Sequence, residues 1–329
     1  MKSRSTLFIS LILIVILFTC SNTDGFYTIE IVEGVNHISN KQAKWNNELG
    51  SPGIDLEFIQ KIGDLDATDE NYILFGPADI YVDAVGNYYV LDAGNFRIQK
   101  YDSDGQFITT IGREGQGPGE MRSGFTIKGD REGNILVIDP GNNRIQKFSP
   151  DGKDLGSTRM PVRAGFIELL SNGEMVTPTT NRGPNSESGS LISIYDVDGN
   201  FLREMGKSIS DSYTTASLMF FAVDADDNII CTFYGRNEIL KFSKEGKQIF
   251  ITDRPLNFSV PERPEKQSLT GPDGNTIEIP IPTIVSLGIK VDEKNRIWAM
   301  TLRDHLVIDE TTVFDPTKTI CKICMVSTV

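Results

Sequence analysis

Between residues 75 and 112, apolar and polar positions alternate with a period of two, and short polar turns interrupt the alternation. This period is typical of a half-buried β-strand. It predicts strands at 79–82, 88–91, 97–101 and 107–111, with turns at 85–87, 92–95 and 103–105 and an end at Gly112. Gly-Asn and Asp-Gly pairs between apolar runs suit tight hairpin turns. The segment therefore reads as four short antiparallel strands in about 40 to 45 residues, the size of one propeller blade.

The same unit recurs along the chain at a fixed interval. Four glycines stand 47 residues apart, each with an aromatic residue four positions before it. These are Gly105, Gly152, Gly199 and Gly246, with Tyr101, Phe148, Tyr195 and Phe242. The best two copies are YYVLDAGNFRIQKYDSDGQF (88–107) and ILVIDPGNNRIQKFSPDGKD (135–154), and weaker copies cover 194–202, 221–247 and 289–316. A repeat of this length indicates stacked units with a shared core, and five of them predict an all-β fold, a β-propeller of four-stranded blades.

One fragment indicates how the ring closes. Residues 58–63 (FIQKIG) match 107–112 (FITTIG) at the Phe, both Ile and the Gly positions, so we expect a fourth strand without its first three. Such a strand would complete a last blade begun by the C-terminus, which predicts a six-bladed propeller with an incomplete sixth blade. Two alternatives stay open: residues 26–50 supply the missing strands, or the chain is a truncated, weakly folding product. An open blade would expose an apolar face and unpaired strand edges.

Two insertions interrupt the repeats. The polar run 181–188 lengthens a turn of the third unit, and roughly 255–283, with six prolines, precedes the fifth unit. Long insertions in regular repeats usually project on one face, often the binding face. We therefore expect the loops 181–190 and 255–284 to form a recognition surface.

The N-terminus is expected to direct export. Lys2 and Arg4 precede an apolar run from Leu7 to Phe18, which is short for a membrane span but suits a signal peptide. Leu17-Phe18-Thr19-Cys20 resembles a bacterial lipobox, which implies cleavage before Cys20 and lipidation of its sulfur. An uncleaved anchor and ordinary secretion are the alternatives. The expected domains are a signal peptide at 1–19, an N-terminal segment at 20–52 and a propeller at 53–329, on the periplasmic or surface side of the envelope.

The net charge and the cysteine content exclude some classes of partner and ligand from the expectations for this protein. The formal net charge is −13, and it becomes −15 when the two cations of residues 1–19 are removed. A body this acidic repels phosphate backbones, which argues against nucleic-acid binding and leaves lipid as the expected membrane contact of a monomer. Cys231, Cys321 and Cys324 form no even disulfide framework. Cys321 and Cys324 stand in an alternating stretch, so a strand would point them to opposite faces, which is unsuited to one metal.

The string IYVDAVGNYYVLDAGNFRIQKYDSDG (80–105) closely resembles an NHL repeat, as does GNILVIDPGNNRIQKFSPDG (133–152). With the lipobox-like end, the whole chain resembles bacterial six-bladed propeller lipoproteins of the NHL kind. The resemblance covers 74–156 best, 190–250 and 285–316 less well, and neither 26–52 nor 255–284. It implies the propeller fold and an extracytoplasmic site. It implies no single activity, because such propellers include binding modules and a few enzymes.

Most repeated polar and aromatic residues suit structural roles. The aromatic column, continued by Phe314, is expected to fill the space between blades. Asp92 with Arg97, and Asp139 with Arg144, are expected to pin turns by charge-assisted hydrogen bonds. The once-per-repeat aspartates are expected to cap turns; these are Asp83, Asp130, Asp224 and Asp292.

Two residues are singled out as candidate ligand contacts. Arg236 has no evident aspartate partner and is a candidate for anion binding, and His305 is a candidate lone base beside Arg303 and Asp304. Only His37 and His305 occur in the chain, and GxSxG, Walker and HExxH motifs are absent from it.

The leading hypothesis from the sequence is a non-catalytic binding module, tethered to the cell envelope, that presents one face to a protein or glycan and needs no cofactor. The alternative is a calcium-dependent hydrolase or lyase, resembling lactonases and esterases, that uses carboxylates in the propeller channel. The latter requires at least three Asp, Glu or Asn oxygens that converge at one mouth of the channel.

Overall fold

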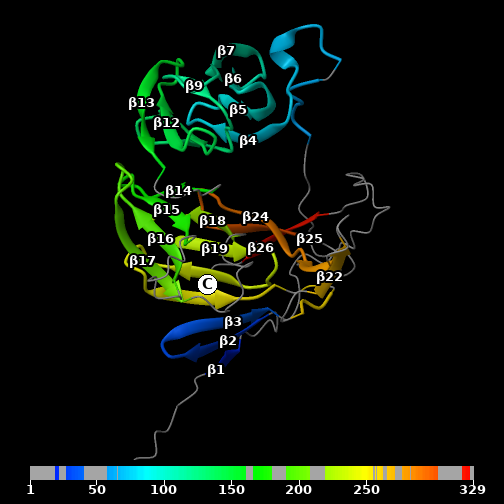
Figure 1. Cartoon of the computed structure of the whole chain (residues 1–329). Helices are drawn as coiled ribbons and strands as arrows, with labels where there is room; N and C mark the ends of the chain where they lie inside the picture. The colour runs from blue at the N-terminus through cyan, green and yellow to red at the C-terminus, as the bar shows by residue number, and fades with distance from the viewer. Residues whose placement is uncertain are drawn as a thin grey trace, which may run out of the picture.

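The computed structural model is all-β and consists of repeated antiparallel sheets (Figure 1). It describes residues 19–21, 27–40, 58–64, 66–160, 166–179, 190–207, 219–254, 256, 258–261, 265–270, 276–281, 283–302 and 321–326. In β1 (Thr19–Ser21) and β26 (Cys321–Val326), and at most positions of β22 (Glu265–Thr270) and β23 (Thr276–Ile281), only the backbone is described.

Four blades have four strands each, in sequence order from the innermost strand outward. Blade 1 comprises β4 (Pro77–Val82), β5 (Tyr88–Asp92), β6 (Arg97–Tyr101) and β7 (Phe107–Ile111). Blade 2 comprises β10 (Thr126–Gly129), β11 (Ile135–Asp139), β12 (Arg144–Phe148) and β13 (Asp154–Arg159). Blade 3 comprises β14 (Glu168–Leu169), β15 (Met175–Pro178), β16 (Ser190–Tyr195) and β17 (Phe201–Lys207). Blade 4 comprises β18 (Met219–Val223), β19 (Ile229–Phe233), β20 (Ile239–Phe242) and β21 (Gln248–Thr252). The strands expected for blade 1 are confirmed to within two residues.

Blade 5 has β24 (Ser286–Val291), β25 (Ile297–Leu302) and β26, which is its third strand. We expected residues 312–316 in that position, with Phe314 in the aromatic column, but they lie outside the described residues. Val326 instead pairs with Ile297, the register that Phe242 has with Ile229 in blade 4. The cysteine pair does lie in a strand, β26, as expected.

The repeat period has a conformational cause. The glycine in the last turn of each of the first four blades has a positive φ, from 77° to 93°. This conformation costs little only for glycine. Four residues earlier, the ladder between the third and fourth strands shifts register at the aromatic residue in all four blades. The aromatic side chains of this column, from Tyr101 to Phe242, are all buried, which confirms their expected core role.

The hydrophobic core consists of clusters between adjacent blades. One cluster joins blades 1 and 2, a second joins 2 and 3, a third joins 3 and 4, and a fourth joins 4 and 5. No equivalent cluster joins blades 5 and 1 in the described part of the chain. The sequence predicted an incomplete sixth blade at this position, and the described residues include no strand of such a blade.

The N-terminal segments lie elsewhere than expected. Residues 58–64 form no strand; Gln60 Nε2 donates to the carbonyl of Ser103, and Phe58 and Ile59 remain exposed. The expectation of a closing strand at 58–63 is therefore not met, because these residues run beside blade 1 without a ladder to a sixth blade.

The hairpin of β2 (Tyr27–Val32) and β3 (Val35–Asn40) extends blade 4 instead. β3 pairs in parallel with β21, giving the order β1-β2-β3-β21-β20-β19-β18, and Figure 1 shows the hairpin below that sheet. Asn40 anchors it, since its backbone N–H donates to Asp253 Oδ1 at 2.8 Å and its Nδ2 donates to Thr252 Oγ1 at 2.9 Å. Residues 27–40 thus do not supply strands of the sixth blade.

Two small sheets complete the described structure. The hairpin β22–β23 is a two-stranded sheet within the proline-rich insertion. The connection between blades 1 and 2 contains the short parallel pair β8 (Arg113–Glu114) and β9 (Glu120–Met121).

Candidate functional site

The innermost strands of the blades enclose a central cavity of about 580 Å³. In Figure 1, β4 lies at the lower side of the upper blades and faces β14, β18 and β24. The cavity takes side chains from all five blades, among them Asp79, Lys128, Glu168, Phe220 and Lys290. A volume in this range suits a small ligand or one group of a larger partner. The channel is therefore the candidate functional site.

Three phenylalanines form one side of this cavity. Phe166 contacts Phe125 edge-to-face with ring centroids 5.4 Å apart, and it contacts Phe220 in the same manner at 5.5 Å. Edge-to-face contacts at these distances stabilise aromatic pairs beyond the area they bury. Leu287 and Met300, both partly exposed, belong to the same lining. The cavity thus offers a fixed apolar wall that remains open to solvent.

Charged side chains from three blades meet at Glu168. Lys128 Nζ lies 2.6 Å from Glu168 Oε1, and Lys290 Nζ lies 3.9 Å from the same oxygen. The Lys128 and Glu168 side chains are 17% and 19% exposed, whereas that of Lys290 is 73% exposed. One carboxylate therefore faces two ammonium groups, and only the inner ammonium is held closely.

The two lysines respond in opposite ways. Loss of hydration opposes the charge of Lys128, but the attraction of Glu168 outweighs it and raises the pKa of Lys128. At Lys290, the low-dielectric protein around the open channel lowers the pKa, and repulsion from Lys128 adds to this effect, while the more distant Glu168 compensates only in part. Of the two lysines, Lys290 is therefore the one whose positive charge is less fully balanced by Glu168.

The other carboxylate in the channel is engaged by the backbone. Asp79 accepts from the N–H of Ile80 at 2.9 Å and from the N–H of Ile127 at 3.1 Å. The second bond ties the innermost strand of blade 1 to that of blade 2. Asp79 thus has a structural role in positioning the channel wall.

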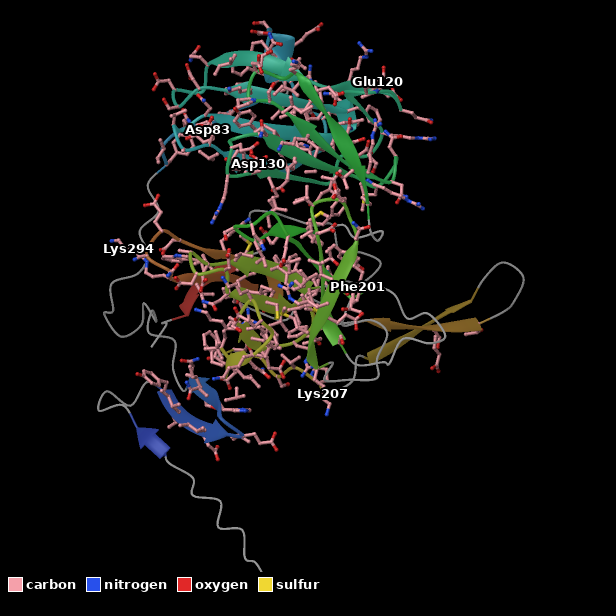
Figure 2. The ribbon with its side chains drawn as sticks, turned by 90° about the vertical axis from the view of Figure 1, so that its left-hand side faces the viewer. Asp83, Glu120, Asp130, Phe201, Lys207 and Lys294 are labelled. Atoms are coloured by element: carbon pink, nitrogen blue, oxygen red, sulfur yellow. The ribbon has the colours of Figure 1, made fainter. Side chains whose placement is uncertain are left out.

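The once-per-repeat aspartates cap turns, as expected. Asp130 Oδ1 accepts from the backbone N–H of Glu132 and of Asn134, and Asp83, Asp224 and Asp292 make the equivalent pairs of bonds two and four residues onward. In Figure 2, Asp83, Asp130 and Lys294 lie on the left-hand side of the molecule and Glu120 on the right-hand side. The turns of Asp83, Asp130 and Asp292 therefore lie on one side of the molecule, and the carboxylates of all four aspartates accept from their own backbone.

The two expected Asp–Arg pairs differ from each other. Arg97 Nε lies 2.9 Å from Asp92 Oδ2, so the first pair is confirmed. Asp139 instead accepts from the backbone N–H of Ser123 and from Asn142 Nδ2, and Arg144 donates to the carbonyls of Gly117 and Glu120. The second expectation is wrong, because each partner finds a nearer group on the blade 1–2 connection.

Of the two candidate ligand contacts, Arg236 and His305, the structure describes Arg236. Arg236 is not a free guanidinium: its Nε and Nη2 donate to both oxygens of Glu238 at 3.0 and 2.7 Å, and it stacks over Phe233. The expectation of an unpaired arginine is thus wrong, since Glu238 two residues later replaces the missing aspartate. His305 lies outside the described residues, and so does the side chain of Cys20. The roles predicted for His305 and Cys20 therefore stay predictions.

Cysteine and metal chemistry receive no further support from the described part of the chain. Burial raises the pKa of the free Cys231 thiol to about 12, which suits an inert core position. Among the described residues, no group of three or more His, Cys, Asp or Glu side chains could hold a metal ion.

The sequence reasoning missed Lys128, Glu168 and Lys290. A signal for them exists, because each stands two residues before the first residue of the innermost turn in its blade; those turn residues are Asp130, Leu170 and Asp292. One repeat position therefore carries Lys, Glu and Lys in blades 2, 3 and 5, and in these three blades it lines the cavity. Comparison of that position across the repeats would have found the cluster.

Comparisons with known proteins bear on the fold. A family model described as DUF5128: 6-bladed beta-propeller matches residues 32–245. No curated protein matches the sequence. Among solved structures, a candidate exported protein from Bacteroides fragilis NCTC 9343 is 14% identical, covers 71% of this chain and 82% of its own, and has a TM-score of 0.48.

Two enzymes are among the similar structures. Virginiamycin B lyase from Staphylococcus aureus is 16% identical and covers 77% of this chain and 85% of its own, with a TM-score of 0.42. A gluconolactonase from Xanthomonas campestris is 14% identical over 69% of each chain, with a TM-score of 0.40. Likeness at this level carries no argument about activity.

Among the described residues, no helix has the length and apolar character needed to span a bilayer.

Proposed function

Since this chain belongs to the DUF5128 family of 6-bladed β-propellers, we propose that it is a non-catalytic binding module, exported and tethered to the cell envelope by lipid on Cys20. It presents one propeller face, with the mouth of the central channel, to a protein or glycan partner. The fold alone is compatible with many activities, so the proposal depends on the chemistry of the channel.

The observation that carries the proposal is the composition of the channel lining. A wall of three phenylalanines stands beside Lys128, Glu168 and Lys290 in one cavity. Aromatic faces with a few convergent polar groups are typical of sites that bind a sugar ring or a peptide side chain. The described lining contains no histidine, cysteine or serine, so among these residues there is no Ser–His or Cys–His pair of the kind used in nucleophilic catalysis.

The second candidate function is a calcium-dependent hydrolase or lyase. It is supported only by the general suitability of carboxylates for calcium. In the described residues the turn aspartates serve their own backbone, and Glu168 and Asp79 are each engaged by protein donors. We therefore place it second, and metal content after dialysis against metal-free buffer tests it: about one tightly held calcium per chain would reverse the order.

A plugged channel tests the leading proposal. Gly288 lines the cavity, and a Cβ at this position meets no atom within 4 Å, so Gly288→Trp has room and should fill the channel. Glycan arrays and crosslinking in the native envelope should be run with wild type, this variant and Lys294→Gln, an exposed control outside the lining. The proposal expects at least one partner that wild type and the control bind and the plugged variant loses. Equal binding by all three would refute the channel as the site.

Tethering is tested separately. Cys20→Ser should release the protein from the membrane fraction into the soluble exported fraction and abolish incorporation of a labelled fatty acid. Membrane association that survives this substitution would contradict the lipid anchor and favour an uncleaved N-terminal anchor.

A further inference from the structure

Of the two lysines near Glu168, only Lys128 is held closely by its carboxylate, and Lys290 is not. Lys128 approaches Glu168 to 2.6 Å, a distance typical of a strong charge-assisted hydrogen bond, and this ammonium is largely buried. Lys290 stands 3.9 Å from the same carboxylate, at the outer limit of an ion pair, with most of its side chain accessible. A single carboxylate cannot satisfy both ammonium groups equally, so Lys290 keeps donors available to the cavity.

The negative groups near Lys290 are already engaged. Glu168 is held by Lys128, and Asp79 accepts two backbone N–H bonds from Ile80 and Ile127. Both carboxylates are therefore fixed on the wall. An anion that enters the cavity at Lys290 therefore meets an exposed ammonium group.

The same cavity supplies an apolar surface. Phe125 is partly exposed and begins the edge-to-face series through Phe166 to Phe220, while Leu287 and Met300 present further apolar area. Burying a flat hydrocarbon against such a wall contributes about 25 cal/mol per Å² of apolar area removed from water. The lining thus pairs one available cation with an apolar wall.

We propose that the channel binds an amphipathic monoanion: a flat apolar or aromatic body that packs on the phenylalanine wall, with one carboxylate that is held by Lys290. This inference rests on the proposed function and names the chemical class of group that the channel accepts, whether free or as part of a larger partner. Lys290 supplies selectivity for the charge, and the wall supplies most of the contact area.

The probe pair is 2-naphthoate and its neutral isostere 2-naphthamide, titrated by calorimetry against the full chain. The expected result is that naphthoate binds at least about tenfold more tightly than the amide, the effect of one charge-assisted hydrogen bond. Lys290→Gln should reduce naphthoate affinity to that of the amide. Lys294→Gln, a matched exposed lysine of the same blade, should leave both affinities unchanged, and thermal unfolding confirms that both variants fold.

Three outcomes of these titrations would contradict the proposed ligand class. Equal affinity for acid and amide, no binding of either, or naphthoate binding that survives Lys290→Gln would overturn it. Gly288→Trp separates this failure from that of the proposed function: if the plugged variant still loses a neutral glycan or protein partner, the binding module stands and only the ligand class is wrong. If no binding of any kind depends on the channel, both fail.

Discussion

Blades 1 and 2 contain the two most similar repeats of the chain, placed in different surroundings. Ile80 and Ile127 occupy equivalent positions on β4 and β10, 47 residues apart, yet Ile80 is 54% exposed and Ile127 is 1% exposed. The cause is the neighbour: blade 2 packs between blades 1 and 3, whereas blade 1 packs only on blade 2 in the described structure. Burial in a repeat protein is thus set by the next unit as well as by the unit itself.

A second pair of equivalent residues, Val82 and Gly129, shows the same influence of the neighbouring blade. Val82 in blade 1 corresponds to Gly129 in blade 2, and a Cβ at Gly129 would lie 2.1 Å from the ring of Tyr81. A side chain at position 129 would therefore displace the Tyr81 ring of the preceding blade. Val82, against which no preceding blade packs in the described part of the chain, is 48% exposed and keeps its side chain.

The largest expected difference concerns Ile127→Ala and Ile80→Ala. The first should destabilise the protein by about 2–5 kcal/mol, because it leaves a cavity between two blades. The second removes a half-exposed side chain and should cost less than about 1 kcal/mol. Urea unfolding of both variants measures the contrast. Equal costs would mean that something covers the face of blade 1 in solution.

The second contrast is between Arg97→Ala and Arg144→Ala. Both arginines donate to backbone carbonyls of the preceding loop, but only Arg97 also pairs with a buried carboxylate. We expect Arg97→Ala to cost about 1–3 kcal/mol more, the worth of a hydrogen bond to a buried charge. A double-mutant cycle with Asp92→Asn isolates the pair. A coupling energy near zero would show that backbone contacts dominate in both blades.

The third contrast concerns pH. Burial alone would raise the pKa of Asp130, but the bonds from Lys147 and Asn134 outweigh it, so the pKa lies below 3.8. The pKa of Asp83 is also lowered, against its burial, chiefly by Asn87 and the turn backbone, with Lys100 as a weaker, purely coulombic contributor. A carboxyl with a depressed native pKa stabilises the fold above pH 3.8, and this contribution is lost as the pH falls through the native pKa.

Lys147→Met should therefore raise the pKa of Asp130 and reduce the loss of stability on acidification, whereas Lys100→Met should change Asp83 little. NMR titration of the two carboxyl groups reads both values. A shift at Asp83 as large as that at Asp130 would contradict the different roles assigned to the two lysines.

What the sequence predicted was local, and what it missed was distant in the chain. Gly105 and its repeats, the turn aspartates and the aromatic column each act within one blade or against the next, so a 47-residue period reveals them. The pairing of β3 with β21 joins Asn40 to Asp253, separated by 213 positions, and no local pattern encodes that edge.

The candidate site was missed for a related reason. Lys128, Glu168 and Lys290 converge only because the arc of blades turns one repeat position toward a common axis. Arg236 illustrates the converse error: the absence of an aspartate at the repeat position suggested a free guanidinium, but Glu238 lies close enough in sequence to pair with it. Repeat logic identifies positions, while the partner at each position depends on the individual blade.

The smallest expected effect tests whether a detail of blade 1 can be transferred to blade 2. Gln99 Oε1 accepts from Thr110 Oγ1 at 2.5 Å, whereas the equivalent Gln146 Oε1 is buried without a hydrogen-bond partner, opposite Ser157. Threonine has restricted side-chain rotamers in a strand, so Ser157→Thr should hold its hydroxyl as Thr110 does and gain about 0.5–1 kcal/mol, the net worth of one hydrogen bond. Thermal unfolding compares this variant with Ser157→Val, which matches the shape without the hydroxyl. A gain shared by both variants would assign the effect to strand propensity, and a gain by threonine alone would show that blade 2 lacks one bond that blade 1 has.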